Sequence, residues 1–212
     1  MGRSPRTLVA ALALWSVCSA CGSRPVRIDI PHDKVDPLPR GTPSEVVIYL
    51  GNFTDARTDR DGIGQSRGGF GGLRRDRYVI DGDVPSLVRA AVKRGIEAQG
   101  HVVTELPGEA NFAIEGRILR CSVDMAQDFP HLVWIAQVES VLEVRGRNRA
   151  LVLKRSLGDD VKIKSLASSP GGRGPAGKAL GDVLERLARS IAADDRLDSA
   201  LRGSESPLGR AK

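Results

Sequence analysis

Residues 64–68 read GQSRG and match G-x-S-x-G, the pattern that presents the nucleophilic serine of many hydrolases. Such an elbow requires a strand that runs directly into the serine and a helix that leaves it, because the strained turn exposes the hydroxyl. Here TDRDGI precedes Ser66 and GGFGGLRRD follows, and neither flank fits. A serine hydrolase that uses Ser66 is therefore kept as an alternative, and we predict no catalytic residue and no enzyme activity.

The same stretch lacks the patterns of a phosphate-binding loop and of a metal site. A phosphate-binding loop ends in Gly-Lys-Ser/Thr and leads directly into a helix, and the sequence has no such ending. Asp59 and Asp61 suggest a calcium loop, but Arg57 stands where a third ligand would belong and the bidentate acid is absent. The histidines have no ligand-like spacing to cysteines, and we expect surface, tether or strand-end positions for them. They are His32, His101 and His131. We predict neither a metal nor a cofactor.

Residues 51–76 form a long polar, glycine-rich segment that we predict to be an exposed, flexible loop. Its cationic and aromatic side chains could grip a partner protein or an anionic surface. They are Arg57, Arg67, Phe70, Arg74 and Arg75, and the glycines singled out among them are Gly64, Gly69 and Gly71. The alternative is a merely solvated connection, although structureless loops of this length are uncommon without a role.

The N-terminus has the pattern of a secretion signal. Arg3 and Arg6 precede an apolar run over residues 7–17, and small residues then lead to Cys21. The apolar run is too short for a mature transmembrane helix, which needs about 20 residues. Ser19 and Ala20 before Cys21 resemble the lipobox of bacterial lipoproteins, at which the chain is cleaved and the cysteine is acylated, for example with palmitate.

The lipobox predicts the compartment. Cys18 stands at the position where such motifs usually have Leu, and an ordinary signal peptide with Cys21 as a free thiol is the alternative. Gly22, rather than Asp, after the acylated cysteine indicates the outer membrane. We therefore predict a signal peptide over residues 1–20 and a lipid anchor at Cys21, with the body facing the periplasm.

Cysteine content indicates whether the protein can form disulfides, and charge indicates which kinds of partner it can bind. After cleavage and acylation Cys121 is the one remaining thiol, so no intramolecular disulfide is available, and its apolar-alternating segment predicts a buried structural thiol. The formal net charge of +6 becomes +4 once Arg3 and Arg6 are removed. This mild excess favours anionic lipid headgroups or acidic envelope polymers. Nucleic acid is not predicted as a partner, because the chain has no basic stripe and few aromatics.

Hydrophobic periodicity predicts one α+β domain over residues 45–201, between a Pro-rich tether at 21–44 and a disordered tail at 202–212. A helix follows the N-cap residue Asp83 and ends at Gly100, and a second spans residues 176–193. We expect strands at 45–50, 77–81, 101–106, 111–125, 131–144 and 150–157, and residues 161–166 extend the pattern after a turn at Asp159-Asp160. A bulge is expected near Ile118. A mainly antiparallel sheet should carry both helices on one face.

The sequence resembles one known family. The strand VVIYL, then Asp55-Ala56-Arg57, Ile63-Gly64, Gly69-Phe70-Gly71 and the helix ending EAQGHVV are similar to the YajG-like lipoproteins of Gram-negative bacteria. The resemblance implies an envelope lipoprotein with an α+β body and no established enzymatic activity. We predict a non-enzymatic outer-membrane lipoprotein that acts as a binding or accessory component of an envelope system. A lipid- or glycan-binding envelope protein is the alternative.

Overall fold

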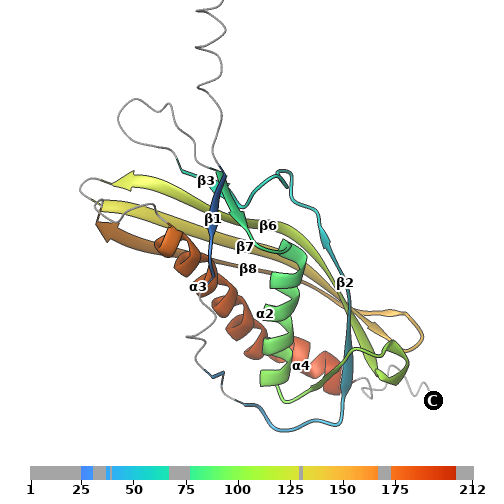
Figure 1. Cartoon of the computed structure of the whole chain (residues 1–212). Helices are drawn as coiled ribbons and strands as arrows, with labels where there is room; N and C mark the ends of the chain where they lie inside the picture. The colour runs from blue at the N-terminus through green and yellow to red at the C-terminus, as the bar shows by residue number, and fades with distance from the viewer. Residues whose placement is uncertain are drawn as a thin grey trace, which may run out of the picture.

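The computed structural model describes residues 25–30, 37–38, 40–66, 77–128, 131–166 and 173–203. The main sheet has the order β5-β2-β6-β7-β8. Its strands are β2 (Val47–Asp55), β5 (Val102–Thr104), β6 (Phe112–Asp128), β7 (His131–Gly146) and β8 (Leu151–Leu166). β6, β7 and β8 are antiparallel neighbours, whereas β2 lies parallel to both β5 and β6. The helices lie on one face of this curled sheet, which confirms the predicted α+β class (Figure 1).

The antiparallel strands alternate between buried and solvent-facing side chains. The inward-facing residues of β7 are buried, namely Trp134, Ala136, Val138, Ser140, Leu142 and Val144. The register of β6 against β7 shifts between Ile118 and Arg120, where the predicted bulge lies. The turn predicted at Asp159-Asp160 is wrong, because β8 continues through both residues in unbroken pairing with β7.

Two predicted helices are present and a third was not predicted. In α2 (Val84–Ala98) the Asp83 carboxylate accepts the Ser86 N–H at 2.8 Å, and Gly100 just beyond the helix has φ of 92°. The other predicted helix is α3 (Arg173–Ala192), and α4 (Asp195–Arg202) follows it. A short 3₁₀ turn, η2 (Pro107–Glu109), follows β5. No helix in the described part of the chain is long and apolar enough to cross a membrane.

A second, three-stranded sheet lies at one end of the body, as Figure 1 shows. β1 (Pro25–Ile28) runs parallel to β4 (Arg77–Ile80), and β3 (Gly64–Gln65) pairs with β4 on its other side. Residues 25–28 had been assigned to the tether, so the folded body begins well before residue 45. The strand was missed because it is short and its pairing partner lies far along the chain.

The chain before β2 is also held against the body. Gly41 N–H donates to the carbonyl of Ala98 at the end of α2, and Ser44 N–H donates to the carbonyl of Gly100. The Arg202 guanidinium of α4 donates to the carbonyl of Thr42 at 3.0 Å. Residues 40–44 therefore follow the ends of α2 and α4 closely, instead of forming the predicted free tether.

Candidate functional site

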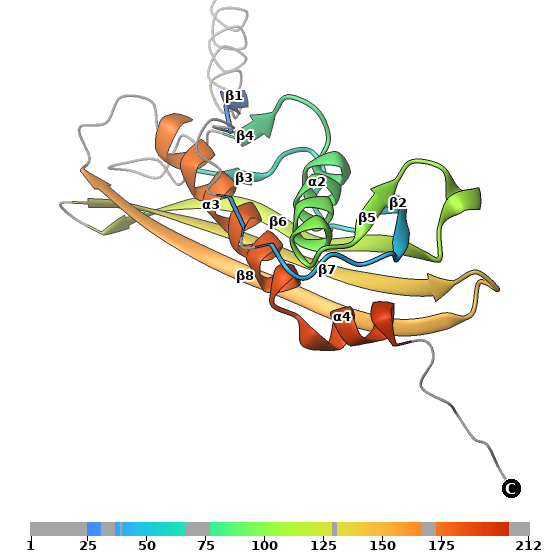
Figure 2. The same ribbon diagram turned by 90° about the horizontal axis from the view of Figure 1, so that it is seen from below.

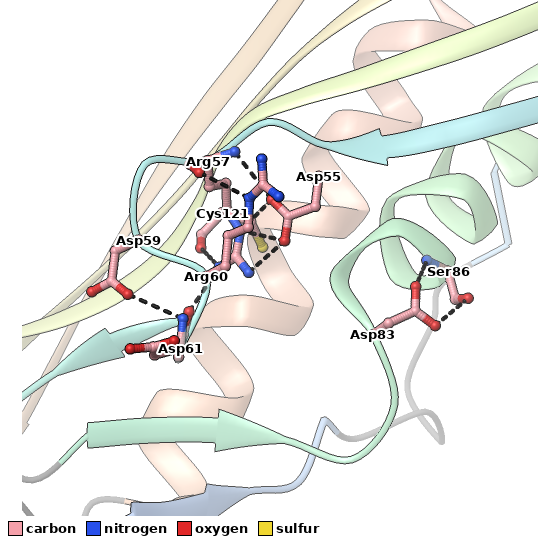
Figure 3. Close-up of polar contacts among 9 residues, drawn as sticks. Asp55, Arg57, Asp59, Arg60, Asp61, Asp83, Ser86 and Cys121 are labelled. Atoms are coloured by element: carbon pink, nitrogen blue, oxygen red, sulfur yellow. Dashed lines mark hydrogen bonds and ion pairs between the residues drawn. The ribbon is translucent and has the colours of Figure 1, made fainter.

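The loop after β2 is organised by a buried arginine. The Arg57 Nε lies 2.9 Å from Asp55 Oδ1 and its Nη2 lies 2.8 Å from Asp55 Oδ2, so the pair is bidentate. Its Nη1 donates to the backbone carbonyls of Gly62 at 2.8 Å and Cys121 at 3.2 Å. We call these four residues the Arg57 cluster; Figure 3 labels Asp55, Arg57 and Cys121.

The cluster corrects one sequence prediction. Arg57 was placed among the exposed cationic side chains of the loop, but only 8% of it is exposed, and its guanidinium is bonded to protein groups. The side-chain hydrogen bond from Arg57 holds the pKa of Asp55 below its ordinary value. The pair therefore ties residues 55–62 to β6, and Arg57 cannot reach a partner without breaking these bonds.

The acids beside the cluster do not form a metal site. Asp59 Oδ1 accepts the backbone N–H of Asp61 at 3.1 Å (Figure 3). Asp61 Oδ2 lies 3.5 Å from Arg77 Nη1. Across the described ranges no group of three or more His, Cys, Asp or Glu side chains is placed to hold a metal ion. Asp59 and Asp61 instead close the loop that carries the chain toward β3.

A hollow of about 470 Å³ lies between this loop and the start of α2. Its lining includes Asp55, Arg57, Arg60, Asp61, Asp83 and Val84. The Asp83 carboxylate accepts both the backbone N–H and the hydroxyl of Ser86 at 2.8 Å, and the backbone bond in particular lowers the pKa of Asp83. A carboxylate of the chain thus already occupies the helix N-terminus, where an external anion would otherwise bind. Apolar side chains, including Ile63, Val79 and Ile80, complete the lining, so the hollow is of mixed polarity.

Two groups that could act as nucleophiles are buried. The Cys121 thiol is 2% exposed, as predicted, and burial raises its pKa to about 11, so it stays protonated at neutral pH. Ser66 is also buried and makes a parallel bridge with Met125 directly after the two residues of β3. The strand before Ser66 is only two residues long, which gives little of the strand that leads into a nucleophile elbow, and the residues after Ser66 lie outside the described part of the chain.

Gly64 is needed where β3 meets β6. Its φ is 140°, and a Cβ at this position would overlap the backbone carbonyl of Val123. The N–H of Val123 donates to the carbonyl of the preceding residue, Ile63, so the two backbones are in direct contact. Gly64 is therefore a packing residue of the loop base. The other predicted site residues lie outside the described residues. They are Cys21, Arg67, Gly69, Phe70, Gly71, Arg74 and Arg75.

A second polar cluster joins the ends of the helices, and the sequence did not reveal it. Asp194 caps α4 by accepting the N–H groups of Arg196 and Leu197, and its other oxygen lies 2.7 Å from Arg155 Nε on β8. The Gln99 side chain donates to the carbonyl of Ile191 at 2.7 Å. Arg155, the ion-pair partner of Asp194, lies on a remote strand, so no local sequence pattern indicates the contact.

His101 belongs to the same region and directly precedes β5, at a strand end as expected, but its burial was not predicted. Its side chain is fully buried, with Nε2 3.0 Å from Asp198 Oδ1, although neither ring nitrogen makes a well-directed hydrogen bond within the described residues. Burial lowers the pKa of His101, and the nearby Arg202 acts in the same direction, while Asp198 opposes them. The imidazole is therefore held neutral in the folded chain.

This burial predicts a pH dependence of stability. Because the unfolded chain binds a proton at His101 more readily than the folded chain, the free energy of unfolding should fall as the pH drops below about 6.5. The carboxylates whose pKa is lowered in the folded chain reduce the free energy of unfolding only when they become protonated, below about pH 5. Urea unfolding between pH 7.5 and 5.5 measures the slope. His101→Gln should flatten it and His131→Gln should not; an unchanged slope in His101→Gln would contradict the assignment.

Comparison with known proteins finds only distant structural similarity. No protein-family profile matches the sequence, and no curated protein matches it significantly. A DUF330 protein of Xanthomonas campestris is 12% identical over 80% of this chain and 93% of that one, with a TM-score of 0.49. A minor lipoprotein of Acinetobacter baumannii is 10% identical over 69% and 92%, with a TM-score of 0.37. A lipoprotein of Neisseria meningitidis is 11% identical over 69% and 98%, with a TM-score of 0.34. The chain is thus similar to bacterial lipoproteins, and likeness at this level assigns it neither a family nor an activity.

Proposed function

We propose that the protein is a non-enzymatic, lipid-anchored component of the bacterial cell envelope whose body docks another envelope protein. The observation that carries the proposal is the run from the basic start through the apolar residues 7–17 to Ser19, Ala20 and Cys21. Gly22 supports anchoring in the outer membrane with the body in the periplasm. Membership of the YajG-like family stays a prediction that rests on the sequence resemblance.

The chemistry of the body supports docking over catalysis. The hollow beside the Arg57 cluster is lined by charged side chains, among them the bidentate Asp55–Arg57 pair, and by apolar side chains such as Ile63, Val79 and Ile80. The Cys121 thiol nearby stays protonated. The charged groups disfavour an acyl chain as a ligand, because burying them against hydrocarbon is costly. A protein surface that carries both polar and apolar groups fits the hollow better.

Residues 67–76 are proposed as the docking segment, with Arg67 and Phe70 as its contacts. The described residues on either side support this, because Gln65 and Arg77 pair with each other and so give the segment a fixed base. Crosslinking in intact cells, followed by purification of the acylated protein, should recover one dominant envelope protein. Arg67→Ala with Phe70→Ala should abolish its recovery, while Lys154→Ala, an exposed cation in β8, should not. Recovery of the protein alone would contradict docking.

A polar hollow on the other face of the sheet favours glycan binding as a second candidate function. This hollow of about 350 Å³ is lined by amide, hydroxyl and charged side chains, and the helices lie on the opposite face (Figure 2). Its polar lining residues include Asn52, Thr54, Glu115, Arg117, Glu143 and Lys154. Native mass spectrometry of protein purified from the envelope should then show a bound polymer, and bare protein would count against this candidate.

A further inference from the structure

The first described strand is an integral part of the folded body. Pro25 pairs with Arg77 and Ile28 pairs with Ile80, and the Ile28 side chain is 2% exposed within the core. Helix α3 packs closely on the residue that follows, because a Cβ on Gly177 would overlap the carbonyl oxygen of Asp29. The position of Pro25 is therefore fixed relative to the rest of the body.

The chain between the proposed anchor and this strand is very short. Only Gly22, Ser23 and Arg24 separate Cys21 from Pro25. Even a fully extended chain covers at most about 14 Å over these four steps. The long tether predicted from composition would have let the body stand far from the membrane, and the pairing of β1 with β4 removes that freedom.

We propose that the edge formed by Pro25, Gln65 and Arg77 lies against the phospholipid headgroups of the membrane in which Cys21 is anchored. The proposal rests on the acylation of Cys21 proposed above. Gln65 and Arg77 belong to this edge because Arg77 pairs with both Pro25 and Gln65. β1 and β4, both labelled in Figure 2, are paired side by side from their first residues.

With the edge at Pro25 against the membrane, the far end of the main sheet points into the periplasm. Ser66 is bridged to Met125, which pairs with Trp134 near one end of β7, whereas Leu151 pairs with Arg145 near the other. Arg145 lies eleven residues beyond Trp134 along β7, or roughly 35 Å at the usual rise of a strand. Leu151 and Val152, whose side chains are exposed, then lie at the end of the body far from the bilayer.

The short chain between Cys21 and Pro25, and not electrostatic attraction, keeps this edge at the bilayer. Arg77 of the edge lies 3.5 Å from Asp61, and Arg27, further along β1, lies 3.1 Å from Asp81. Both arginines therefore already have an acidic partner. The orientation should therefore persist in high salt, which screens interactions between exposed charges.

Fluorescence quenching tests the orientation on the full-length acylated protein. Gln65→Cys and Val152→Cys each place one exposed thiol for a maleimide dye, and the buried Cys121 should not label. The proteins are reconstituted in vesicles of phosphatidylethanolamine and phosphatidylglycerol that contain a lipid with a nitroxide-labelled headgroup. We expect several-fold stronger quenching at position 65 than at position 152, in low and high salt alike.

A linker variant is the matched control. Inserting about 20 Gly and Ser residues after Cys21 gives the chain a mean span of about 25 Å and should reduce quenching at position 65 toward that at position 152. Mass spectrometry of the N-terminal peptide reports acylation separately. An acylated protein with equal quenching at both positions would overturn the orientation alone, whereas an unmodified Cys21 would overturn both the orientation and the proposed anchor.

Discussion

Replacing Arg57 with alanine is expected to lower the free energy of unfolding by about 4 kcal/mol, which is typical of breaking a buried ion pair by removing one partner. The Asp55 side chain, 20% exposed, would lose its bidentate partner. The backbone carbonyls of Gly62 and Cys121 would lose their Arg57 donor in the same substitution. Urea unfolding monitored by the fluorescence of the buried Trp134 measures the change.

Arg60→Ala is the matched control for this prediction. Arg60 lies in the same loop and makes one side-chain hydrogen bond, from its Nε to the carbonyl of Arg57 at 3.3 Å. Its loss should change the free energy of unfolding by about 0.5 kcal/mol or less, as for other surface substitutions. Equal effects of the two substitutions would show that the Arg57 cluster does not hold the loop.

Asp194→Ala should lower the free energy of unfolding by about 3 kcal/mol, from the loss of a helix cap and of a buried partner for Arg155. One carboxylate oxygen caps α4, and the other lies 2.7 Å from Arg155, while the Asp194 side chain is only 5% exposed. Arg155 is about one-third exposed, so water replaces part of its lost partner. Urea unfolding at neutral pH measures the change.

Asp194→Asn separates the contribution of the helix cap from that of the ion pair with Arg155. The asparagine oxygen can still accept the N–H groups of α4, because Asn is as good an N-cap residue as Asp. Only the charge opposite Arg155 is lost, so the expected cost is about 1 kcal/mol. If Asn and Ala were equally destabilising, capping would contribute nothing and the ion pair would carry the whole effect.

The sequence predicted the elements whose signals are local. Asp83 with Pro85 at the start of α2 and Gly100 after it define that helix by themselves, because caps and breakers act within one turn. The alternation from Trp134 to Val144 fixes which face of β7 is buried, since side chains alternate along a strand. In β6, a shift in the phase of the apolar alternation was enough to locate the bulge after Ile118.

Features that depend on distant residues were not predictable. Arg57 appeared to be one of several loop cations, because nothing local shows that its Nη1 will meet the carbonyl of Cys121. His101 appeared to be a strand-end residue, and its burial depends on α4, whose short segment gave no clear periodicity. β2 could be recognised as a strand, but its position between β5 and β6 depends on pairings that no turn specifies.

The pairing of β1 with β4 also constrains the order in which the chain folds. The hairpins of β6, β7 and β8 join neighbouring segments and can form early, because short loops close at little entropic cost. Pro25 must instead wait for Arg77, and Gly64 must meet Val123, before the small sheet is complete. β1, the first described strand of the chain, is thus among the last to find its partner.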